Sequence, residues 1–460
     1  MLFSSTVFLF VFLTIVIIGY FNPWWKSRQF RNLWLLAASI LFYAWGEPVF
    51  IWIMTGSILV NWLISKRLTG NKGWLIAAIV WNLGILLVFK YLNFILSNVG
   101  YLLDRNFVIT DIQLPIGISF FTFQILSYIF DVYAGKVKPQ KSLYKFALYV
   151  SMFPQLVAGP IVRYSQIAAE IDDRKENRTE FNDGFIRFVY GLGKKVILSN
   201  YMGILADNAF YLSKEGELSV AMAWLGAIAY TLQIYYDFSG YSDMAIGLGR
   251  MFGFHFAENF NYPYIASSIT EFWRRWHISL SGWFRDYVYI PLGGNRKGLA
   301  RTICNTFAVW LLTGIWHGAN WTFIVWGMGY CALILLERAF HKTICGKMPG
   351  HIWTMAWVIL LWVVFRADSL AAAGDYFAAM FGGRSNVWDI NAASAFSGSW
   401  LALVIAIIFA APVGDFLAKK SRFMERNRRT LRYALAVPVF IVCIAKCAVS
   451  AYNPFIYFNF

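Results

Sequence analysis

The chain has 460 residues, of which 59% are hydrophobic, 19% aromatic and only 14% charged. Soluble domains carry about 25% charged residues, so this composition excludes an ordinary soluble protein. The net charge of +16 would suggest a nucleic-acid partner in a soluble protein. Here the Lys and Arg residues stand between apolar runs, which is typical of membrane topology, and we predict no nucleic-acid binding.

Apolar runs near 20 residues long recur along the chain and predict helices that cross a bilayer. We therefore predict an all-α polytopic membrane protein with about eleven transmembrane helices, together with re-entrant and amphipathic helices. The candidate spans are residues 4–20, 32–46, 49–65, 74–103 (one span or two), 112–133, 144–162, 183–212, 220–248, 302–336, 352–366, 397–417 and 433–452.

The connections between spans predict the orientation. Bases follow the first and third spans, whereas "WGEPVF", between the second and third, holds none. The segment "KKSRFMERNRR" at 419–429 is the most basic connection. Basic loops stay in the cytoplasm, so the first residue is expected outside. The polar stretch 170–182, "EIDDRKENRTEFN", is expected to be a solvated loop or the start of an interfacial helix.

His317 lies in "LLTGIWHGANW", inside the long apolar run between Arg301 and Glu337. An unbroken helix would place it about 24 Å from Arg301, in a hydrocarbon core about 30 Å thick. Intramembrane polar groups face a cavity or a partner, so the ring is either a structural hydrogen-bonding group, a proton relay, or a catalytic base. Burial favours the neutral imidazole, which can accept a proton from a hydroxyl.

A second histidine, His277, lies in residues 271–289, "EFWRRWHISLSGWFRDYVY". Apolar residues recur there with spacings of three and four, at Trp273, Trp276, Leu280, Trp283 and Tyr287. This pattern predicts one amphipathic helix at an interface or a cavity wall, with His277 at the margin of the apolar stripe. Arg274, Arg275 and Arg285 are expected to project away from the stripe.

The next residues, "IPLGGNRKG" (290–298), form a Gly-rich basic turn that contains Asn295, Arg296 and Lys297. It is either a cytoplasmic loop that follows the positive-inside tendency, or a site whose amides and bases hold a phosphate-bearing acyl donor. The turn lacks the GKS or GKT ending of a P-loop, so nucleotide hydrolysis is not supported.

Two further stretches place polar residues beside apolar runs: Asp237, Ser239, Ser242 and Asp243 in 232–254, and Gln124 and Asp131 in 114–133. These groups either line a tunnel or join helices by hydrogen bonds. The five cysteines form no CxxC pair and show no zinc spacing, so no metal site is predicted.

Several long motifs, in order, resemble the membrane-bound O-acyltransferase family and in particular its bacterial branch of alginate and exopolysaccharide O-acetyltransferases. They are "LPIGISFFTFQILSYIFDVY", "FPQLVAGPIVRY", "FWRRWHISLSGWFRDYVYIPLGGNRKG", "LTGIWHGANWTFIVWG" and "PFIYFNF". The resemblance covers nearly the whole chain and implies one domain over residues 1–460, with a motif-dense core at about 112–332.

The resemblance also implies a bundle around a central tunnel, in which a donor from the cytoplasm and an acceptor from outside meet at a histidine. That histidine corresponds to His317, and His277 matches the second polar position of the active site, commonly Asn or His. Arg274, Arg275, Arg285, Asn295, Arg296 and Lys297 would hold the anionic donor.

The predicted function is O-acetylation of an exported polysaccharide such as alginate by an enzyme of the cytoplasmic (inner) membrane. The donor substrate would be acetyl-CoA or another acetyl thioester, with no permanently bound cofactor. The partners would be a separate extracytoplasmic acetyltransferase and a polysaccharide-synthesis complex.

Two alternatives stay open. The first is the D-alanyl transfer protein of teichoic acid assembly, a similar protein that takes its acyl group from a carrier protein, although "IPLGGNRKG" favours the acetylating branch. The second is a transporter or channel in which His317 relays protons, although the chain shows no paired broken helices in two similar halves.

Overall fold

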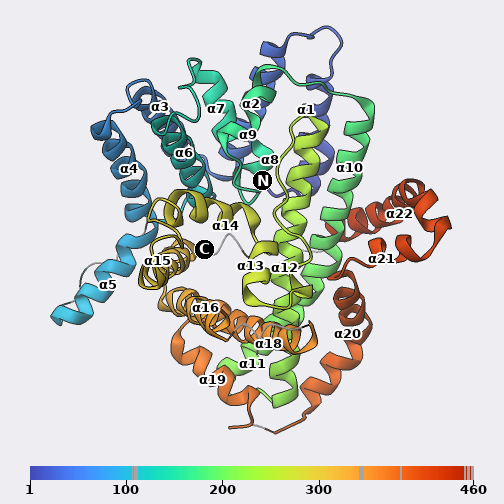
Figure 1. The fold of residues 1–460 in the computed structure, drawn as a ribbon. Helices are drawn as coiled ribbons and strands as arrows, with labels where there is room; N and C mark the ends of the chain where they lie inside the picture. Colours follow the sequence, from blue (N-terminus) through green and yellow to red (C-terminus); the bar gives the residue numbers. More distant parts are fainter. Residues whose placement is uncertain are drawn as a thin grey trace. The chain divides into compact units, whose positions relative to one another are not determined.

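The computed structural model describes residues 1–105, 107, 112–340, 347–383, 386–449, 452 and 456, and every regular element in these ranges is a helix (Figure 1). The terminal motif "PFIYFNF" therefore lies outside the described residues except for Ile456. The chain forms two compact units, residues 1–188 with 241–258 and residues 189–240 with 259–460.

The first unit contains the N-terminal helices and the end of α12. They are α1 (Leu13–Tyr20), α2 (Arg28–Gly46), α3 (Ile51–Ser65), α4 (Lys72–Leu86), α5 (Leu92–Leu103), α6 (Ile118–Tyr133), α7 (Leu143–Ser151), α8 (Phe153–Leu156), α9 (Tyr164–Asp172) and most of α10 (Arg178–Gly193). Aromatic rings fill its interior. Phe8, for example, contacts the rings of Phe42 and Phe153.

The second unit contains both histidines that the sequence singles out. Its helices are α11 (Asn200–Glu215), most of α12 (Val220–Met251), α13 (Ile269–Arg275), α14 (Ile278–Phe284), α15 (Leu299–His317), α16 (Trp321–Ala339), α18 (Lys347–Arg366), α19 (Leu370–Met380), α20 (Ile390–Phe409), α21 (Val413–Lys420) and α22 (Arg422–Val449).

Five helical segments are long and apolar enough to cross a membrane: Lys72–Leu103, Trp321–Ala339, Met348–Arg366, Ile390–Phe409 and Arg422–Val449. Three shorter apolar helices are Val7–Tyr20, Ile51–Ser65 and Ile118–Tyr133. The expected all-helical architecture with several apolar helices is confirmed, while the number of eleven crossings and the central tunnel stay predictions. The candidate span 144–162 is wrong, because α7 has only nine residues and the chain leaves the helix at Met152.

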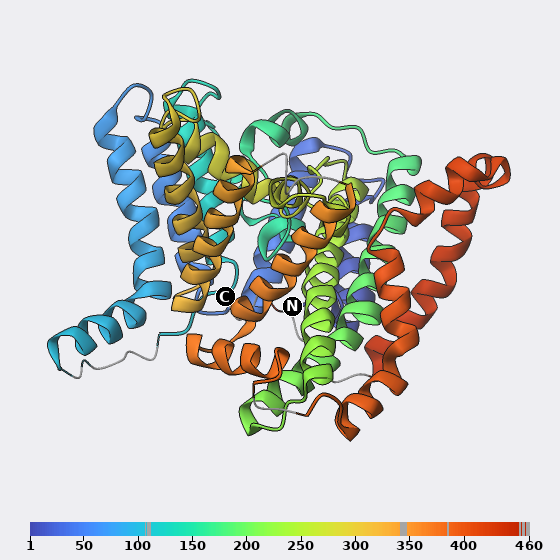
Figure 2. The ribbon, with the colours of Figure 1, turned by 60° about the horizontal axis from the view of Figure 1, so that its bottom comes forward.

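The predicted single span 302–336 is also wrong, because it consists of two helices, α15 and α16 (Figures 1 and 2). Gly318 is extended, and the side chain of Asn320 accepts a hydrogen bond from the backbone N–H of Thr322, which caps α16. The helices pack closely because two glycines face backbone: a Cβ at Gly314 would lie 2.6 Å from the carbonyl oxygen of Phe323, and one at Gly327 would lie 2.6 Å from that of Trp310. His317 therefore lies at the turn of a helical hairpin.

The amphipathic helix predicted over 271–289 is interrupted as well. Helices α13 and α14 have seven residues each and are separated by Trp276, which is extended, and His277, which has a left-handed φ of 44°. The preceding loop pairs with this break: the N–H of Asn261 donates to the carbonyl of Arg275, and the N–H of Ile278 donates to that of Asn259, both at 2.9 Å. These long-range bonds outweigh the helical periodicity and bury His277 completely, where the margin of an apolar stripe was expected.

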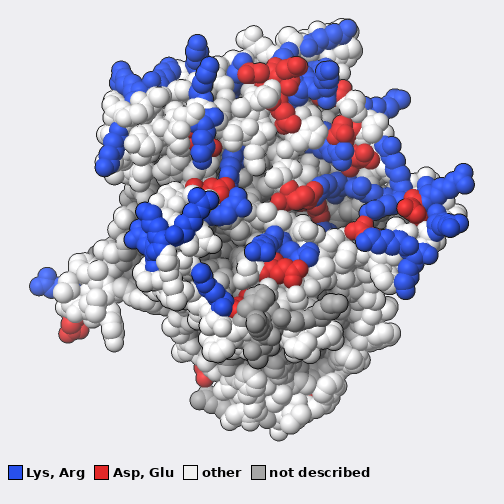
Figure 3. Space-filling model, in the orientation of Figure 1, with Lys and Arg blue, Asp and Glu red and all other residues white. Residues whose placement is uncertain are grey.

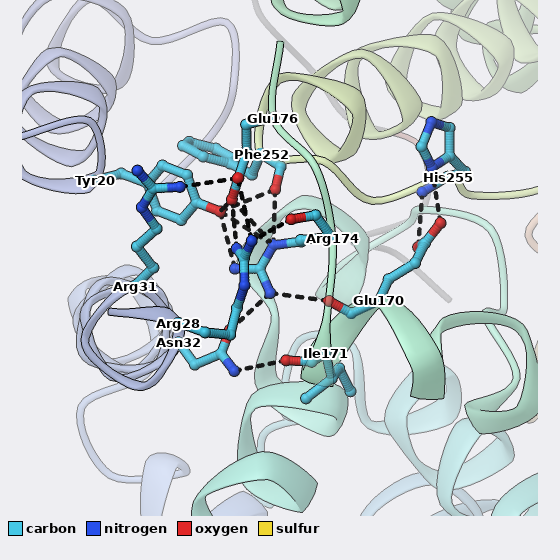
Figure 4. A network of polar contacts seen from close by, with 10 residues as sticks. All are labelled: Tyr20, Arg28, Arg31, Asn32, Glu170, Ile171, Arg174, Glu176, Phe252 and His255. Atoms are coloured by element: carbon cyan, nitrogen blue, oxygen red, sulfur yellow. Dashed lines mark hydrogen bonds and ion pairs between the residues drawn. The ribbon is translucent and has the colours of Figure 1, made fainter. Parts of the chain in front are cut away.

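The polar stretch 170–182 is more than a solvated loop. Arg174 is only 4% exposed, and its guanidinium donates to the side chain of Asn32, the hydroxyl of Tyr20 and the carbonyl of Phe252 (Figure 4). Glu176 accepts hydrogen bonds from Tyr20 and from arginines of α2. This network fastens the loop to the ends of α1 and α12 within the first unit.

Helices α21 and α22 carry the predicted basic segment 419–429, and their Lys and Arg side chains gather on the surface of these helices (Figure 3). Its bases are exposed, and an ion pair joins Arg428 to Asp415 across the hairpin. Exposed apolar side chains, including Phe416 and Phe423, lie beside these charges. This combination is typical of a helix hairpin at a membrane surface.

Candidate active site

His317 is the last residue of α15 and is 3% exposed. Three aromatic rings surround its imidazole, all edge-on: Trp316 at 5.0 Å, Trp326 at 4.9 Å and Phe365 at 5.2 Å between centroids. All three of these contacts of the imidazole are therefore with aromatic, apolar rings.

His277 lies in the same unit and is connected to His317 through one side chain. The ring of Trp316 lies 6.0 Å from the ring of His277 and 5.0 Å from that of His317. The remaining face of His277 contacts Phe238 of α12 at 4.6 Å. The structure thus brings together, around one tryptophan, the two histidines that the sequence places 40 residues apart.

The hydrogen bonds of His277 involve Asn259, which the sequence analysis did not single out. Nδ1 of His277 lies 3.1 Å from Oδ1 of Asn259, and the same oxygen accepts from the backbone N–H of Ser279 at 3.1 Å and from its hydroxyl at 2.8 Å. His277 and Asn259 lie outside the helical segments that are long and apolar enough to cross a membrane, and burial lowers the pKa of His277 to about 3. His277 is therefore neutral at physiological pH.

A cavity of about 380 Å³ opens beside His317 in the second unit. Four aromatic rings, two hydroxyls, an amide and three charged side chains contribute to its lining, from Phe210, Tyr230, Phe323, Phe365, Ser213, Thr322, Asn320, Lys214, Arg366 and Asp368. Phe365 contacts His317 and also lines the cavity, so this phenyl ring adjoins both the imidazole and the cavity.

Arg366, a further residue that the sequence analysis missed, is held rigidly at this cavity. Its guanidinium lies over the rings of Phe210 and Tyr230, 4.7 and 4.8 Å from their centroids. It also pairs with Asp207, which accepts a hydrogen bond from the hydroxyl of Tyr452. An arginine at the end of an apolar helix resembles an ordinary topology signal, so only its contacts reveal the site.

The six residues expected to hold the donor lie on exposed or half-buried positions. Arg274 is exposed, Arg275 pairs with Glu271 at 2.8 Å, and Arg285 pairs with Asp286 at 2.7 Å. Asn295, Arg296 and Lys297 are exposed on the turn that precedes α15. Their role toward a donor stays a prediction.

The turn that carries these last three residues has a defined conformation. Gly293, Gly294 and Gly298 have positive φ values of 108°, 57° and 87°, which glycine adopts without strain. The side-chain amide of Asn305 donates to the carbonyl of Gly294 at 2.9 Å, and Nε of Arg301 donates to that of Leu292 at 2.9 Å. The first turns of α15 therefore anchor the basic turn.

Two of the polar residues of 232–254 and 114–133, Asp237 and Gln124, join separate segments of the chain. Asp237 is 1% exposed and pairs with Lys195 at 2.6 Å, and its other oxygen accepts from the N–H of Ile456. Gln124 donates to the carbonyl of Tyr149 at 2.7 Å. For these residues the structure favours the helix-joining alternative over the tunnel-lining one.

Known proteins are similar to this chain over half of its length or more. The profile of the membrane-bound O-acyltransferase family matches residues 80–370. The chain is 40% identical to the probable alginate O-acetylase AlgI of Pseudomonas putida, over the full length of both proteins. It is 35% identical to the peptidoglycan O-acetyltransferase of Helicobacter pylori over 83% of this chain and 80% of that protein.

A more distant likeness, 27% identity over 54% of this chain and 65% of the relative, joins it to the teichoic acid D-alanyltransferase of Bacillus subtilis. The family profile covers more than half of the chain and includes α13 to α16, with both histidines and the basic turn. The chain is therefore a membrane O-acyltransferase that belongs to the membrane-bound O-acyltransferase family.

Proposed function

We propose that this enzyme moves an acetyl group from a cytoplasmic thioester donor through the membrane for the O-acetylation of an exported polysaccharide such as alginate. Two kinds of support favour acetate as the acyl group. The relatives that match over four fifths of the chain or more are named as O-acetylases, acting on alginate or on peptidoglycan. The relative named as a D-alanyltransferase matches only about half of it.

The course of α15 is the observation that carries the proposal. Its 19 residues make a helix about 28 Å long, close to the thickness of a hydrocarbon core. The basic turn 293–298 precedes its first residue, and His317 is its last. The cavity lies at the His317 end, because its lining includes Asn320, Thr322 and Phe323. An acceptor in the cavity would thus lie at the same end of α15 as His317. A donor bound at the basic turn would reach His317 from the opposite end of this helix.

The reaction follows from a neutral imidazole. His317 takes the proton of the acceptor hydroxyl while its oxygen attacks the thioester carbonyl. The carbon–sulfur bond breaks, and the leaving thiolate takes the proton back from the imidazolium. General-base assistance of this kind is worth roughly 10²–10⁴-fold in rate.

Acetyl-CoA is the donor that we propose, because its phosphates need cationic and amide partners. Arg274, Arg285, Arg296 and Lys297 would supply charge, and the glycines of the turn would supply backbone N–H groups. His317 itself is 3% exposed, so access to it requires a contacting side chain such as Phe365 to move away from the imidazole.

The enzyme would lie in the cytoplasmic (inner) membrane, with the acetyl group leaving on the external side. A separate extracytoplasmic acetyltransferase and a polysaccharide-synthesis complex would be its partners.

The test is to replace His317 with Ala in cells that carry the chain as their only such enzyme, and to measure ester-linked acetate on the exported polymer. We expect acetate to fall at least 100-fold with normal protein levels in the membrane. The matched control is His255→Ala, which removes an exposed histidine of the first unit. Acetylation at the wild-type level in the His317 variant would contradict the assignment.

The D-alanyl alternative has its own support in the Bacillus subtilis relative. Hydrolysis of the cell envelope and identification of the released ester-linked acid separates the two. Acetate supports the proposal, and D-alanine supports the alternative.

A further inference from the structure

A basic surface that the proposed reaction does not use covers α21 and the first turns of α22. We call residues 413–432, which form it, the basic hairpin. Its sequence holds seven bases against two acids, an excess of five positive charges: Lys419, Lys420, Arg422, Arg426, Arg428, Arg429 and Arg432 against Asp415 and Glu425. All seven bases are exposed, and they gather on the surface of these two helices (Figure 3).

The length of α22 places the basic hairpin at a bilayer surface. The 28 residues of this helix, which is apolar enough to cross a membrane, extend over about 42 Å. The hydrocarbon core is only about 30 Å thick, so roughly eight residues of α22 lie outside it. The bases of α22 stand at 422–432 and at Lys446, near its two ends. The first turns of α22 therefore lie at the depth of the lipid head groups.

Exposed apolar side chains accompany the bases of the hairpin. Phe416 and Leu417 of α21, and Phe423 and Met424 of α22, are all exposed. A soluble anionic partner such as nucleic acid would leave these side chains in water, whereas the boundary between head groups and acyl chains buries them. The combination of bases and apolar side chains therefore favours a lipid surface over a soluble anion.

Three arginines of α22 form a stripe that fits phosphate groups. Arg422, Arg426 and Arg429 follow one another at spacings of four and three, so they lie along one side of the helix. Like charges at these spacings repel one another, and an anion bound along the stripe removes this repulsion. A guanidinium binds a phosphate through two parallel N–H···O bonds, so the stripe suits the phosphodiester groups of phospholipids.

Helix α22 is packed directly against the rest of the second unit. The hydroxyl of Tyr190 donates to the carbonyl of Arg432 at 2.8 Å. Further along, a Cβ at Gly193 would lie 2.9 Å from Cγ1 of Val439, so the two backbones approach closely. Gly193 precedes the π-helix η3 (Lys194–Ser199), which carries the buried base of the Lys195–Asp237 pair. Lipids that hold the start of α22 thus stabilise the unit that contains both histidines.

We propose that the basic hairpin binds the head groups of anionic phospholipids in the cytoplasmic leaflet, with Arg422, Arg426 and Arg429 on the phosphates and the apolar side chains of Phe416 and Phe423 at the acyl boundary. The cytoplasmic side follows from the positive-inside tendency of basic segments. The leaflet on that side carries a negative surface potential, and each base close to it contributes roughly a fivefold gain in binding.

The first test compares two lipids on the wild-type protein. The full-length protein in detergent micelles is titrated with phosphatidylglycerol or with phosphatidylcholine of the same chain length, and native mass spectrometry gives the Kd of each. We expect the Kd for phosphatidylglycerol to be at least about tenfold lower in about 0.1 M ammonium acetate. Screening should reduce the difference to about threefold or less in about 0.5 M ammonium acetate. Equal Kd values at the lower concentration would overturn the proposal.

The second test assigns the preference to the arginine stripe. Replacing Arg422, Arg426 and Arg429 together with Gln should raise the Kd for phosphatidylglycerol about tenfold or more and leave that for phosphatidylcholine unchanged. The matched control replaces three exposed bases between α3 and α4 that are also expected in the cytoplasm, Lys66→Gln, Arg67→Gln and Lys72→Gln. We expect this control to change the Kd by less than about threefold. Equal losses in both variants would assign the effect to net charge and refute the proposal.

A third test distinguishes a lipid surface from a site for free phosphate. Inorganic phosphate at about 10 mM should change the Kd for phosphatidylglycerol less than about twofold, because it offers no acyl chains to the apolar side chains. The double variant Phe416→Ser with Phe423→Ser should weaken phosphatidylglycerol binding several-fold. Full displacement by inorganic phosphate, with no effect of the double variant, would show a free-phosphate site and contradict the proposal.

Thermal unfolding in nanodiscs checks folding and the consequence for the second unit. The wild-type protein should unfold at a higher temperature in nanodiscs with about one-third phosphatidylglycerol than in pure phosphatidylcholine. The Arg→Gln triple variant should lose this difference, while it unfolds like the wild-type protein in phosphatidylcholine. If it does not fold, Arg→Lys at the same three positions keeps the charges and should keep the lipid preference within about threefold. Loss of the preference in the Arg→Lys variant would refute the electrostatic account.

This inference and the proposed function fail separately. The lipid titrations use no acyl donor and no acceptor, so their result holds whichever acyl group the enzyme transfers.

Discussion

The ring of Phe365 lies 5.2 Å from the ring of His317 and also lines the cavity beside it. Phe365 thus adjoins both a buried imidazole and space that can hold a substrate, and we take it as part of the barrier between them. Since Phe365 and His317 belong to α18 and α15, the barrier depends on how these helices pack and on the rotamer of a single residue.

Replacing Phe365 with Leu should open this barrier to water. We expect hydrolysis of acetyl-CoA without transfer to rise several-fold relative to acetyl transfer, because a smaller side chain leaves His317 accessible from the cavity. The ratio of free acetate to acetylated acceptor, measured with labelled acetyl-CoA, checks this. The control is Phe381→Leu, at an exposed position after α19. An unchanged ratio in Phe365→Leu would show that Phe365 is not the barrier.

The α15–α16 hairpin should tolerate no larger residue at its glycines. In Gly314→Ala the new Cβ would lie 2.6 Å from a backbone oxygen, so the helices must separate. We expect a loss of about 1–3 kcal/mol in stability and most of the activity, because His317 lies on the same hairpin. Gly398→Ala in α20, where nothing lies within 4 Å of the new Cβ, is the control and should leave the thermal unfolding temperature unchanged or slightly raised.

The Lys195–Asp237 pair should be costly to break. Lys195→Met removes the cation that pairs with the carboxylate of Asp237, which is 1% exposed. We therefore expect the free energy of unfolding to fall by about 3–5 kcal/mol. The double variant with Asp237→Leu should recover most of it. Thermal unfolding in nanodiscs measures both.

The exposed pair between Lys214 and Asp368 is the matched control for the buried one. Lys214→Met should change stability by less than about 1 kcal/mol, since exposed ion pairs contribute little. Equal effects at the two pairs would contradict this account of burial.

The basic turn should bind the donor through its charges. Arg296→Gln combined with Lys297→Gln should raise the KM for acetyl-CoA several-fold and weaken its dependence on salt, while the acceptor KM stays the same. Lys419→Gln with Lys420→Gln, in the last turn of α21, is the control with the same change in charge. If both double variants raise the donor KM alike, the effect belongs to net charge and not to the turn.

The network around Glu176 should make the first unit sensitive to acid. Burial alone would raise the pKa of Glu176, but hydrogen bonds from Arg28 and Tyr20 outweigh it and hold the pKa at about 2, against an ordinary value of 4.5. Its contribution to stability is therefore complete above about pH 4.5 and is lost as the pH falls toward 2. Unfolding temperatures between pH 7 and pH 3 should fall more steeply for the wild-type protein than for Glu176→Gln, and parallel curves would contradict this.

Properties that depend on residues close together in the sequence could be predicted from the sequence. Length and hydrophobicity of the apolar runs identify a helical membrane protein, because the bilayer imposes a minimum length on each span. The motifs around His317 and His277 identify the family and the kind of chemistry, since they are contiguous in the chain. Among the described residues, both histidines are buried in the unit that carries the basic turn.

Only the tertiary structure decided where these pieces bend and what they touch. The extended Gly318 and the cap at Asn320 divide one apolar run into two helices. The packing of these two helices outweighs the tendency of a continuous apolar run to form a single helix. Asn259 fixes the ring of His277 from 18 residues away, and Arg366 meets Asp207 from 159 residues away. Such partners are joined by the fold alone, so no local pattern in the sequence could reveal them.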